Sequence, residues 1–344
     1  MKVRPWTAAL AIAAVLAPTH VPEASAKTPR QRSIYAVHYI ASQQKPNGAF
    51  RGSLSPVGTA ADAVLALVAA GRSPQTLERA VAFLDRRVQQ GAADTIGLKA
   101  KVVMAAVAWG ADPSDFGGSD LVAEIRDSAQ PDGRLGAETP VFEHALGILA
   151  LRAAEAELPA NSAEWLAAAQ CGDGGWQFDE PAAPTDDEHC VSNIPTSEDF
   201  FPSDTNTTSL AVQALAFEAA PAPAADPLAY FEATRDAVKR GWGYSSGFIT
   251  DTNSTALVLQ AYYALGHVLP NGSPRRLRKL QYRGCSKSPG AFAFTWEEQD
   301  DGTYKKDAAN VAATIAAVPA LLGKPLPIDQ ADVTKRARRW RCMR

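Results

Sequence analysis

Three absences narrow what this chain of 344 residues can be. Beyond residue 26, no apolar run is long enough to cross a membrane, which argues against an integral membrane protein. Alternating apolar and polar runs are scarce, so a β-sheet core is not expected. A basic excess is also missing, because 34 Lys and Arg stand against 37 Asp and Glu, and nucleic acid is therefore not an expected partner.

The first residues have the pattern of an export signal. Lys2 and Arg4 precede an apolar run over residues 8–16, and Ala24-Ser25-Ala26 offers a small-residue cleavage site. We therefore expect residues 1–26 to be a secretory signal peptide, the protein to be secreted, and residues 27–344 to form a single domain. The basic tail, 335–344, could touch an anionic envelope polymer or lipid surface. A solvated last helix is the interpretation that we favour for this tail.

Cysteine is scarce: the chain has four, namely Cys171, Cys190, Cys285 and Cys342. No C-x-x-C or H-x-x-x-H spacing accompanies them, so neither a metal site nor a cofactor is expected. An even number of cysteines in an exported chain favours disulfides, and four cysteines allow three pairings. We favour Cys171 with Cys190, which closes a short loop, and Cys285 with Cys342, which attaches the basic tail to the last repeat.

Internal repetition is the strongest pattern in the chain. Residues 204–215, DTNTTSLAVQAL, and residues 251–262, DTNSTALVLQAY, share their polar start and a later Gln-Ala at the same offsets. Residues 307–318, DAANVAATIAAV, are a looser copy. Three further apolar helices are expected to begin near Thr59, Thr95 and Thr139. Helices that are apolar nearly all round are buried on most faces, and a more amphipathic helix precedes each one. The sequence thus predicts an all-α fold of six outer and inner helix pairs.

The turns between paired helices combine glycine with a large apolar residue. QCGDGGWQF, at 170–178, is the fullest example. The glycines expected at positive φ are Gly48, Gly133, Gly174 and Gly290. The large residues expected to fold back between helices are Phe50, Leu135, Trp176, Trp242 and Phe292. We interpret these turns as repeated fasteners of the fold.

Two of the turns carry a family resemblance. Gln170-x3-Gly174-x-Trp176 matches the QW pattern of squalene and oxidosqualene cyclases, and Gln44-x3-Gly48-x-Phe50 is a softer copy. With its repeated D-T-N helices, the chain resembles the prenyltransferase and squalene-cyclase repeat family. It is also similar to the helical barrel of the transcobalamin and intrinsic factor family. The resemblance covers nearly all of residues 27–344 and implies an (α/α)6 toroid, a fold that carries several activities.

The resemblance does not extend to catalytic residues. The chain has no D-x-D-D, the motif whose Asp protonates the substrate of squalene cyclases, and its cysteines lack the zinc-binding context of protein prenyltransferases. A carbohydrate-active enzyme of the same shape would need paired carboxylates, for which Asp204, Asp251, Asp307 and Glu143 are available. Each Asp precedes an apolar helix, however, so we interpret all three as helix N-caps. His144, next to Glu143, is interpreted as a hydrogen-bonded core residue.

Binding is the remaining interpretation. Parallel inner helices would gather their N-termini around one mouth of the toroid, with a polar rim above an apolar bore. The candidate rim residues are Asp204, Asn206, Asp251, Asn253, Asp307, Asn310, Trp242 and Tyr244. We expect a secreted, non-catalytic protein that binds a small hydrophobic or corrinoid-like ligand, or a partner protein, at this mouth. A terpene cyclase- or prenyltransferase-like enzyme and an (α/α)6 carbohydrate-active enzyme are the alternatives.

Overall fold

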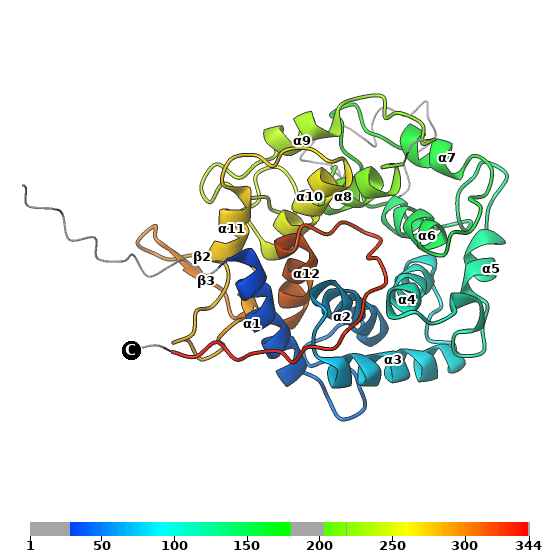
Figure 1. Cartoon of the computed structure of the whole chain (residues 1–344). Helices are drawn as coiled ribbons and strands as arrows, with labels where there is room; N and C mark the ends of the chain where they lie inside the picture. Colours follow the sequence, from blue (N-terminus) through cyan, green and yellow to red (C-terminus); the bar gives the residue numbers. More distant parts are fainter. Residues whose placement is uncertain (1–27, 180–202, 218, 343–344) are drawn as a thin grey trace, which may run out of the picture.

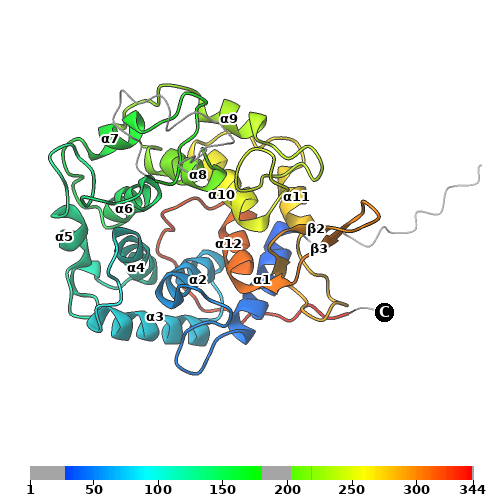
Figure 2. The same cartoon turned by 180° about the vertical axis from the view of Figure 1, so that it is seen from behind.

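The computed structural model describes residues 28–179, 203–217 and 219–342. The predicted signal peptide and Cys190 lie outside these ranges. Within them, the chain forms two concentric layers of α-helices, with only short strands (Figures 1 and 2). The all-α toroid predicted from the sequence is confirmed. In the described part of the chain, no helix combines the length and apolar character needed to cross a bilayer.

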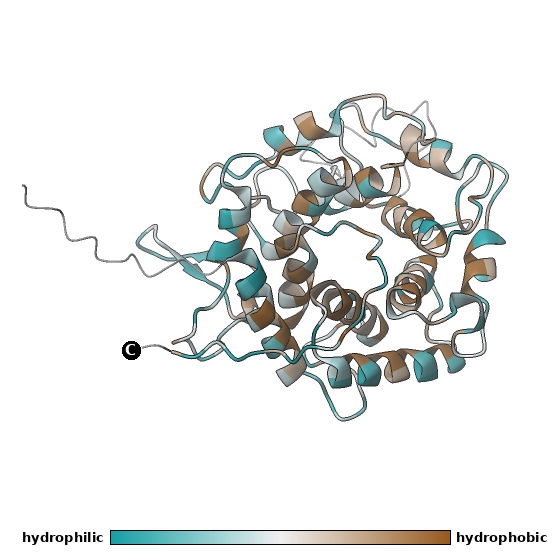
Figure 3. Ribbon diagram, viewed as in Figure 1, coloured by the Kyte–Doolittle hydropathy of each residue, from teal (hydrophilic) through white to brown (hydrophobic). Residues whose placement is uncertain are grey.

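The inner layer is a closed ring. Its helices are α2 (Pro56–Ala70), α4 (Ile96–Trp109), α6 (Val141–Ala153), α8 (Thr205–Ala214), α10 (Thr252–Ala264) and α12 (Val311–Leu321). Each contacts the next, and α12 contacts α2, which closes the ring. Their residues are mostly Ala, Val and Leu, and Figure 3 shows much of this ring in the brown of hydrophobic residues. Burial on nearly all faces therefore determines the position of these helices.

The outer layer surrounds this ring. Its helices are α1 (Pro29–Ser42), α3 (Pro74–Gln89), α5 (Leu121–Arg126), α7 (Ser162–Ala168), α9 (Pro227–Ala233) and α11 (Ser273–Lys279). A 3-10 turn, η1 (Pro113–Asp115), precedes α5. Outer helices alternate with inner ones along the chain, so each turn carries the chain inward and each longer connection carries it outward again.

The predicted fasteners are confirmed at four turns. Gly48, Gly133, Gly174 and Gly290 have φ between +87° and +100°. A Cβ on Gly48 would lie 2.2 Å from the Arg79 carbonyl oxygen of α3, and a Cβ on Gly290 would lie 2.3 Å from the Tyr35 carbonyl oxygen of α1. Only glycine combines positive φ with so close an approach. Each of these two turns is thereby held against the next outer helix, and the last one closes the outer layer onto α1.

The large residues of the turns are buried as predicted. Phe50, Leu135, Trp176, Trp242 and Phe292 are all at most 1% exposed. The glutamine of the pattern has its own role, since Gln170 Nε2 donates to Gly174 O within its turn and to Ala225 O before α9, both at 2.9 Å. Gln44 and Gln281 make the matching pairs of bonds in their own turns. Gln281 was not identified from the sequence because an insertion separates it from Gly290.

Short strands occupy the insertion before α12. β1 (Phe292–Ala293) pairs antiparallel with β4 (Ala309–Asn310), and β2 (Trp296–Glu298) pairs antiparallel with β3 (Tyr304–Lys306). The acidic stretch 297–302 thus forms part of a hairpin. Its pairing of Glu297 with Lys305 across the two strands places opposite charges side by side, which is favourable.

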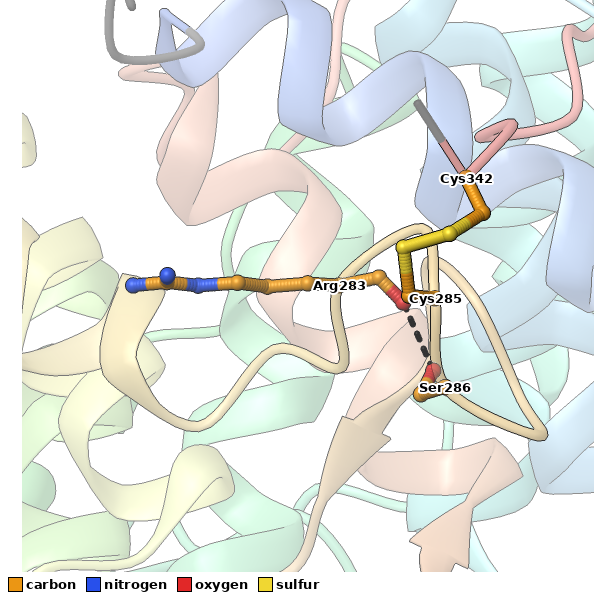
Figure 4. The surroundings of a disulfide bond; sticks show 4 residues. All are labelled: Arg283, Cys285, Ser286 and Cys342. Atoms are coloured by element: carbon orange, nitrogen blue, oxygen red, sulfur yellow. Dashed lines mark hydrogen bonds between the residues drawn. A yellow bond between two sulfur atoms is a disulfide. The ribbon is translucent and has the colours of Figure 1, made fainter. Parts of the chain in front are cut away.

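The basic tail differs from the favoured expectation, because it is not a helix. Residues 322–342, here called the strap, run in an extended path across one end of the ring (Figure 1). Ser73 N donates to Lys335 O at 2.8 Å, and the Trp340 ring stacks on Tyr35 at 4.8 Å. Contacts with several helices replace the hydrogen bonds that a helix would make within itself. The predicted Cys285–Cys342 disulfide is confirmed and attaches the end of the strap (Figure 4).

Only one cysteine of the second predicted disulfide, Cys171, lies within the described residues. Cys171 is buried and disulfide-bonded. Its expected partner, Cys190, lies outside the described residues.

Candidate functional site

The inner ring encloses a cavity of about 230 Å³. Every inner helix contributes to its wall, and the lining residues recur at intervals of four and three along a helix. In α10 they are Asn253, Leu257 and Gln260, and in α12 they are Ala312, Ile315, Ala316 and Pro319. Such spacing keeps side chains on one face of a helix. The face that lines the cavity is thus set by the helical period.

Two asparagines occupy the same position at the start of this wall. Asn206 and Asn253 are the second residues of α8 and α10, and both line the cavity. Their Oδ1 atoms are buried, and neither accepts a hydrogen bond. A buried carbonyl oxygen without a donor costs about 1–3 kcal/mol, so a donor supplied by a ligand would be favoured here. The structure brings these two predicted site residues together.

A charged pair completes the polar part of the cavity. Lys101 Nζ of α4 lies 2.8 Å from Asp62 Oδ2 of α2, and the two side chains are 24% and 40% exposed. This pair was not predicted from the sequence. The available signal was that Asp62 is the one charged residue in an otherwise apolar inner helix, where an unpaired charge would be costly.

The strap closes the other end of the cavity. Gln260 Nε2 donates to Lys324 O, and Leu326 N donates to Gln213 Oε1, both at 2.9 Å. Leu326 itself lines the cavity. The two matched glutamines therefore hold the strap in place. Because the lining begins at the second residues of α6, α8, α10 and α12, the mouth lies at the N-terminal ends of the inner helices.

Exposed aromatic residues stand at the N-terminal ends of three neighbouring inner helices. The carbonyl oxygens of Phe178, Tyr244 and Phe294 accept the backbone N–H of Phe142, Thr205 and Thr252 respectively. Their side chains are 37%, 40% and 38% exposed. Phe248, which contacts Tyr244, is 58% exposed. The predicted site residue Tyr244 thus belongs to an aromatic rim on the side of α6, α8 and α10.

Asp204 and Asp251 are the N-caps of α8 and α10. Asp204 Oδ1 accepts from Thr207 N, and Asp251 Oδ1 accepts from Ser254 N, both at 2.8 Å, as predicted. Neither lines the cavity. Burial raises the pKa of each carboxyl to about 6, although the hydrogen bonds from the following residues act in the opposite direction. These two carboxylates serve the ends of α8 and α10.

The alignment of the third repeat at Asp307 is wrong by three residues. The cap of α12 is Asn310, whose Oδ1 accepts from Ala313 N at 2.9 Å. Asp307 lies between β3 and β4, and its carbonyl accepts a hydrogen bond from the Tyr282 hydroxyl. The strands lengthen the connection, so the polar residue next to the helix takes the role of the cap. Neither residue lines the cavity.

Trp242 lies apart from the mouth. Its side chain is fully buried, and its indole Nε1 donates to Phe231 O at 2.6 Å. Both features assign this residue to the packing between α9 and α10.

Glu143 and His144 have structural partners. Glu143 Oε2 accepts from Gly97 N at the start of α4, at 2.9 Å. His144 is fully buried, its Nδ1 accepts from Leu135 N at 3.0 Å, and its Nε2 lies 2.9 Å from Ser162 O. Burial lowers the pKa of His144 to about 4. The interpretation of His144 as a hydrogen-bonded core residue is confirmed.

No family model matches this chain, and no curated protein matches its sequence. Solved structures do share its fold. A protein from Actinoplanes has a TM-score of 0.53 at 15% identity, covering 86% of this chain and 99% of the other. Type II terpene cyclase MstE from Scytonema has a TM-score of 0.55 at 13% identity, with 86% and 97% covered. A glycosidase crystallised with glucose has a TM-score of 0.51 at 11% identity, also with 86% and 97% covered.

These similarities lie in the fold alone, because each identity is far below the level at which function is shared. They give no support to the transcobalamin resemblance. They agree with the closed helix ring and the glycine-aromatic turns described above. The chain therefore has the terpenoid cyclase-like α/α-toroid fold.

Proposed function

We propose that this protein is a secreted, non-catalytic binder that holds a small amphiphilic molecule in the bore of its toroid. The pair of buried asparagine oxygens, Asn206 Oδ1 and Asn253 Oδ1, carries the proposal. Each oxygen lacks a donor, and both asparagines line a cavity whose remaining wall is mainly apolar. The ligand that fits has an apolar body and a head that donates hydrogen bonds, such as a hydroxyl group. The aromatic rim offers apolar contacts at the entrance.

A structural neighbour supports this class of ligand. The structure of a variant of MstE is known in complex with geranylgeranyl dihydroxybenzoate, its substrate. An isoprenoid alcohol is smaller than geranylgeranyl dihydroxybenzoate but likewise has an isoprenoid chain and a hydroxyl group. A corrinoid-like ligand stays an alternative, which visible absorption of the purified protein would reveal.

Secretion rests on separate observations. Residues 1–26 have the pattern of a signal peptide. The Cys285–Cys342 disulfide is typical of proteins from oxidising compartments.

Catalysis has less support than binding. Protonation of a polyprene would require a carboxylic acid that faces the cavity in its protonated form. Asp62 faces the cavity, but its carboxylate contacts the Lys101 ammonium group. In this pair the carboxylate accepts a hydrogen bond from the ammonium group.

The test is binding of farnesol by the purified full chain, measured by native mass spectrometry and calorimetry. Ala312 lines the cavity and is exposed, so Ala312→Trp should fill the bore and weaken binding at least tenfold. Ala168→Trp is the matched control, since Ala168 is an exposed alanine of the outer helix α7. Absence of binding to the wild type, or equal binding by both variants, would overturn the proposal.

A second variant tests the role of the asparagine oxygens. Asn253→Leu removes an acceptor that has no donor in the free protein, so we expect unchanged or higher stability towards urea. The same change should weaken farnesol binding, because the hydroxyl group loses its partner. A parallel fall in stability and binding would indicate a structural role instead.

A carbohydrate-active enzyme is the second candidate, supported by one observation. Asp62 and Glu143 both line a cavity of about 210 Å³ beside the mouth, between α2, α4 and α6. Paired carboxylates are the usual groups for glycoside hydrolysis. Turnover of nitrophenyl glycosides by the wild type, lost in Asp62→Asn and in Glu143→Gln, would favour this function over the binder.

A further inference from the structure

The basic residues of this chain are concentrated in three segments. Residues 28–42 contain two Lys or Arg, residues 273–287 contain six, and the strap contains six. The only acidic residues in these segments are Asp329 and Asp332. The whole chain has a slight acidic excess, so this distribution is strongly asymmetric.

The first two segments and the end of the strap lie side by side on one flank of the toroid. Gln281 Nε2 donates to Arg32 O at 3.0 Å, which joins the segment after α11 to α1. The disulfide and the Tyr35–Trp340 stack attach the strap to the other two segments. Figure 1 shows α1, α11 and the end of the strap together at one side of the ring. We call the surface formed by these segments, together with Arg72, the basic face.

Cations on the basic face are close enough to affect one another. Burial and the neighbouring Arg338 and Arg30 lower the pKa of Arg72. The pKa of His38 is lowered by burial and by Arg339. Among the described residues, the ion pairs formed by Lys and Arg side chains include none of Arg30, Arg72, Arg336, Arg338 and Arg339. These five arginines therefore form no ion pair with a carboxylate of the described residues.

A recess lies within the basic face. It measures about 530 Å³ and is formed by the start of α1 and the C-terminal ends of α2 and α12. Arg30, Arg72 and Lys324 line it, and no Asp or Glu does. Arginine presents a planar fork of donors that matches the oxygens of carboxylate, sulfate and phosphate groups. An anionic group of a ligand would find several donors in this recess.

We propose that the basic face binds a linear anionic polysaccharide, with one acidic group seated in the recess and others on the arginines of the strap. The extended strap presents its charges along a line, which suits a chain-like partner. Binding to a lipid surface is less favoured, because the large hydrophobic side chains that are exposed in the described structure all lie outside the three segments. The Cys285–Cys342 disulfide is typical of proteins from oxidising compartments, which include the cell surface.

The test uses a heparin-derived decasaccharide and the full secreted chain. Arg336, Arg338 and Arg339 are exposed, and none of their side chains makes a hydrogen bond or ion pair within the described residues. Replacing all three by Gln should weaken binding roughly tenfold and reduce the dependence of log K on log salt, since fewer counterions are released. The matched control replaces the exposed Lys45, Arg51 and Lys305, which lie outside the three segments, by Gln and should bind like the wild type.

Each other outcome overturns the proposal. Equal weakening of decasaccharide binding in the two triple variants would show a general effect of net charge. Absence of binding by the wild type at 50 mM salt would show that the basic face does not bind anionic polysaccharides. Tighter binding to single-stranded DNA or to phosphatidylglycerol vesicles would identify a different class of partner. Ala312→Trp, which fills the bore, should bind the decasaccharide normally, so this test and that of the central cavity are independent.

Discussion

At the scale of single residues, the hydrogen bonds of buried polar atoms distinguish residues that cap helices from candidate ligand-binding residues. Asp204 and Asp251 use a carboxylate oxygen to accept N–H groups at a helix start, whereas Asn206 and Asn253, two positions further on, have an oxygen without a donor. The sequence placed all four near one mouth. It could not separate them, because the difference lies in which side of the helix start each side chain faces.

Asp204 makes stability depend on pH in an unusual direction. Its pKa is raised to about 6 in the folded state, so between pH 4 and 6 the folded chain binds more protons than the unfolded chain. Stability contributed by this group therefore falls as pH rises through that window, by about 3 kcal/mol for a shift of this size. Asp204→Asn keeps a capping oxygen without the charge, so its stability relative to the wild type should increase from pH 4 to pH 7.

Urea unfolding at a series of pH values measures this effect. Asp226→Asn, at the exposed cap of α9, is the control, because it makes the same chemical change outside the core. A constant difference between Asp204→Asn and the wild type across pH 4–7 would contradict the prediction.

At the scale of elements, one position in the inner helices secures the preceding turn. The Oγ1 atoms of Thr208, Thr255 and Thr314 accept the backbone N–H of the large residue of the turn, Trp176, Trp242 and Phe292 respectively. Each threonine stands four residues after its helix cap. His144 stands four residues after Pro140 and accepts from Leu135 N in the same way. The histidine thus takes the place of a threonine in its repeat.

This equivalence predicts how substitutions of His144 differ. His144→Thr keeps an acceptor for Leu135 N, whereas His144→Leu leaves that buried N–H without one. We expect the leucine variant to be less stable than the threonine variant by about 1–3 kcal/mol at pH 7, measured by urea unfolding. Equal stability of the two variants would show that this hydrogen bond contributes little.

The same variants should change the response to acid. The folded pKa of His144 is depressed to about 4, so the unfolded chain binds more protons between pH 4 and 6.5, and stability from this group is lost as pH falls through that window. Both variants should lack this loss. The pH dependence of stability from His144 is opposite in sign to that from Asp204, so the two partly cancel in the wild type. Variants of each residue alone are therefore needed to observe either effect.

At the scale of the whole molecule, the strap connects the closed end of the bore to the outer layer of helices. It begins after α12, crosses the ends of inner helices at Gln260 and Gln213, and ends at the disulfide beside α1. In Figure 4 the bond between Cys285 and Cys342 links the loop after α11 to the last described residues. The cavity is therefore closed at one end by chain that is covalently fixed.

Removal of this bond should loosen the strap without opening the helix ring. Cys342→Ser removes the cross-link and so increases the conformational entropy of the unfolded chain. We expect the free energy of unfolding to fall by about 2–4 kcal/mol. The basic residues of the strap should then be cut by trypsin many times faster, while the helices resist. Cys285→Ser must behave alike if the disulfide is responsible. Unchanged cleavage in both variants would show that the noncovalent contacts alone hold the strap.

The sequence by itself determined the repeated units of this protein. Apolar inner helices, their Asp caps at 204 and 251, the positive-φ glycines and the buried aromatic residues were all predictable, because each follows from local spacing and backbone conformation. The Cys285–Cys342 pairing was also predicted. The tertiary structure decided what distant segments do together. The Asp62–Lys101 pair requires α2 to pack against α4, and the strap over the bore and the basic face require the last helices to meet the first ones.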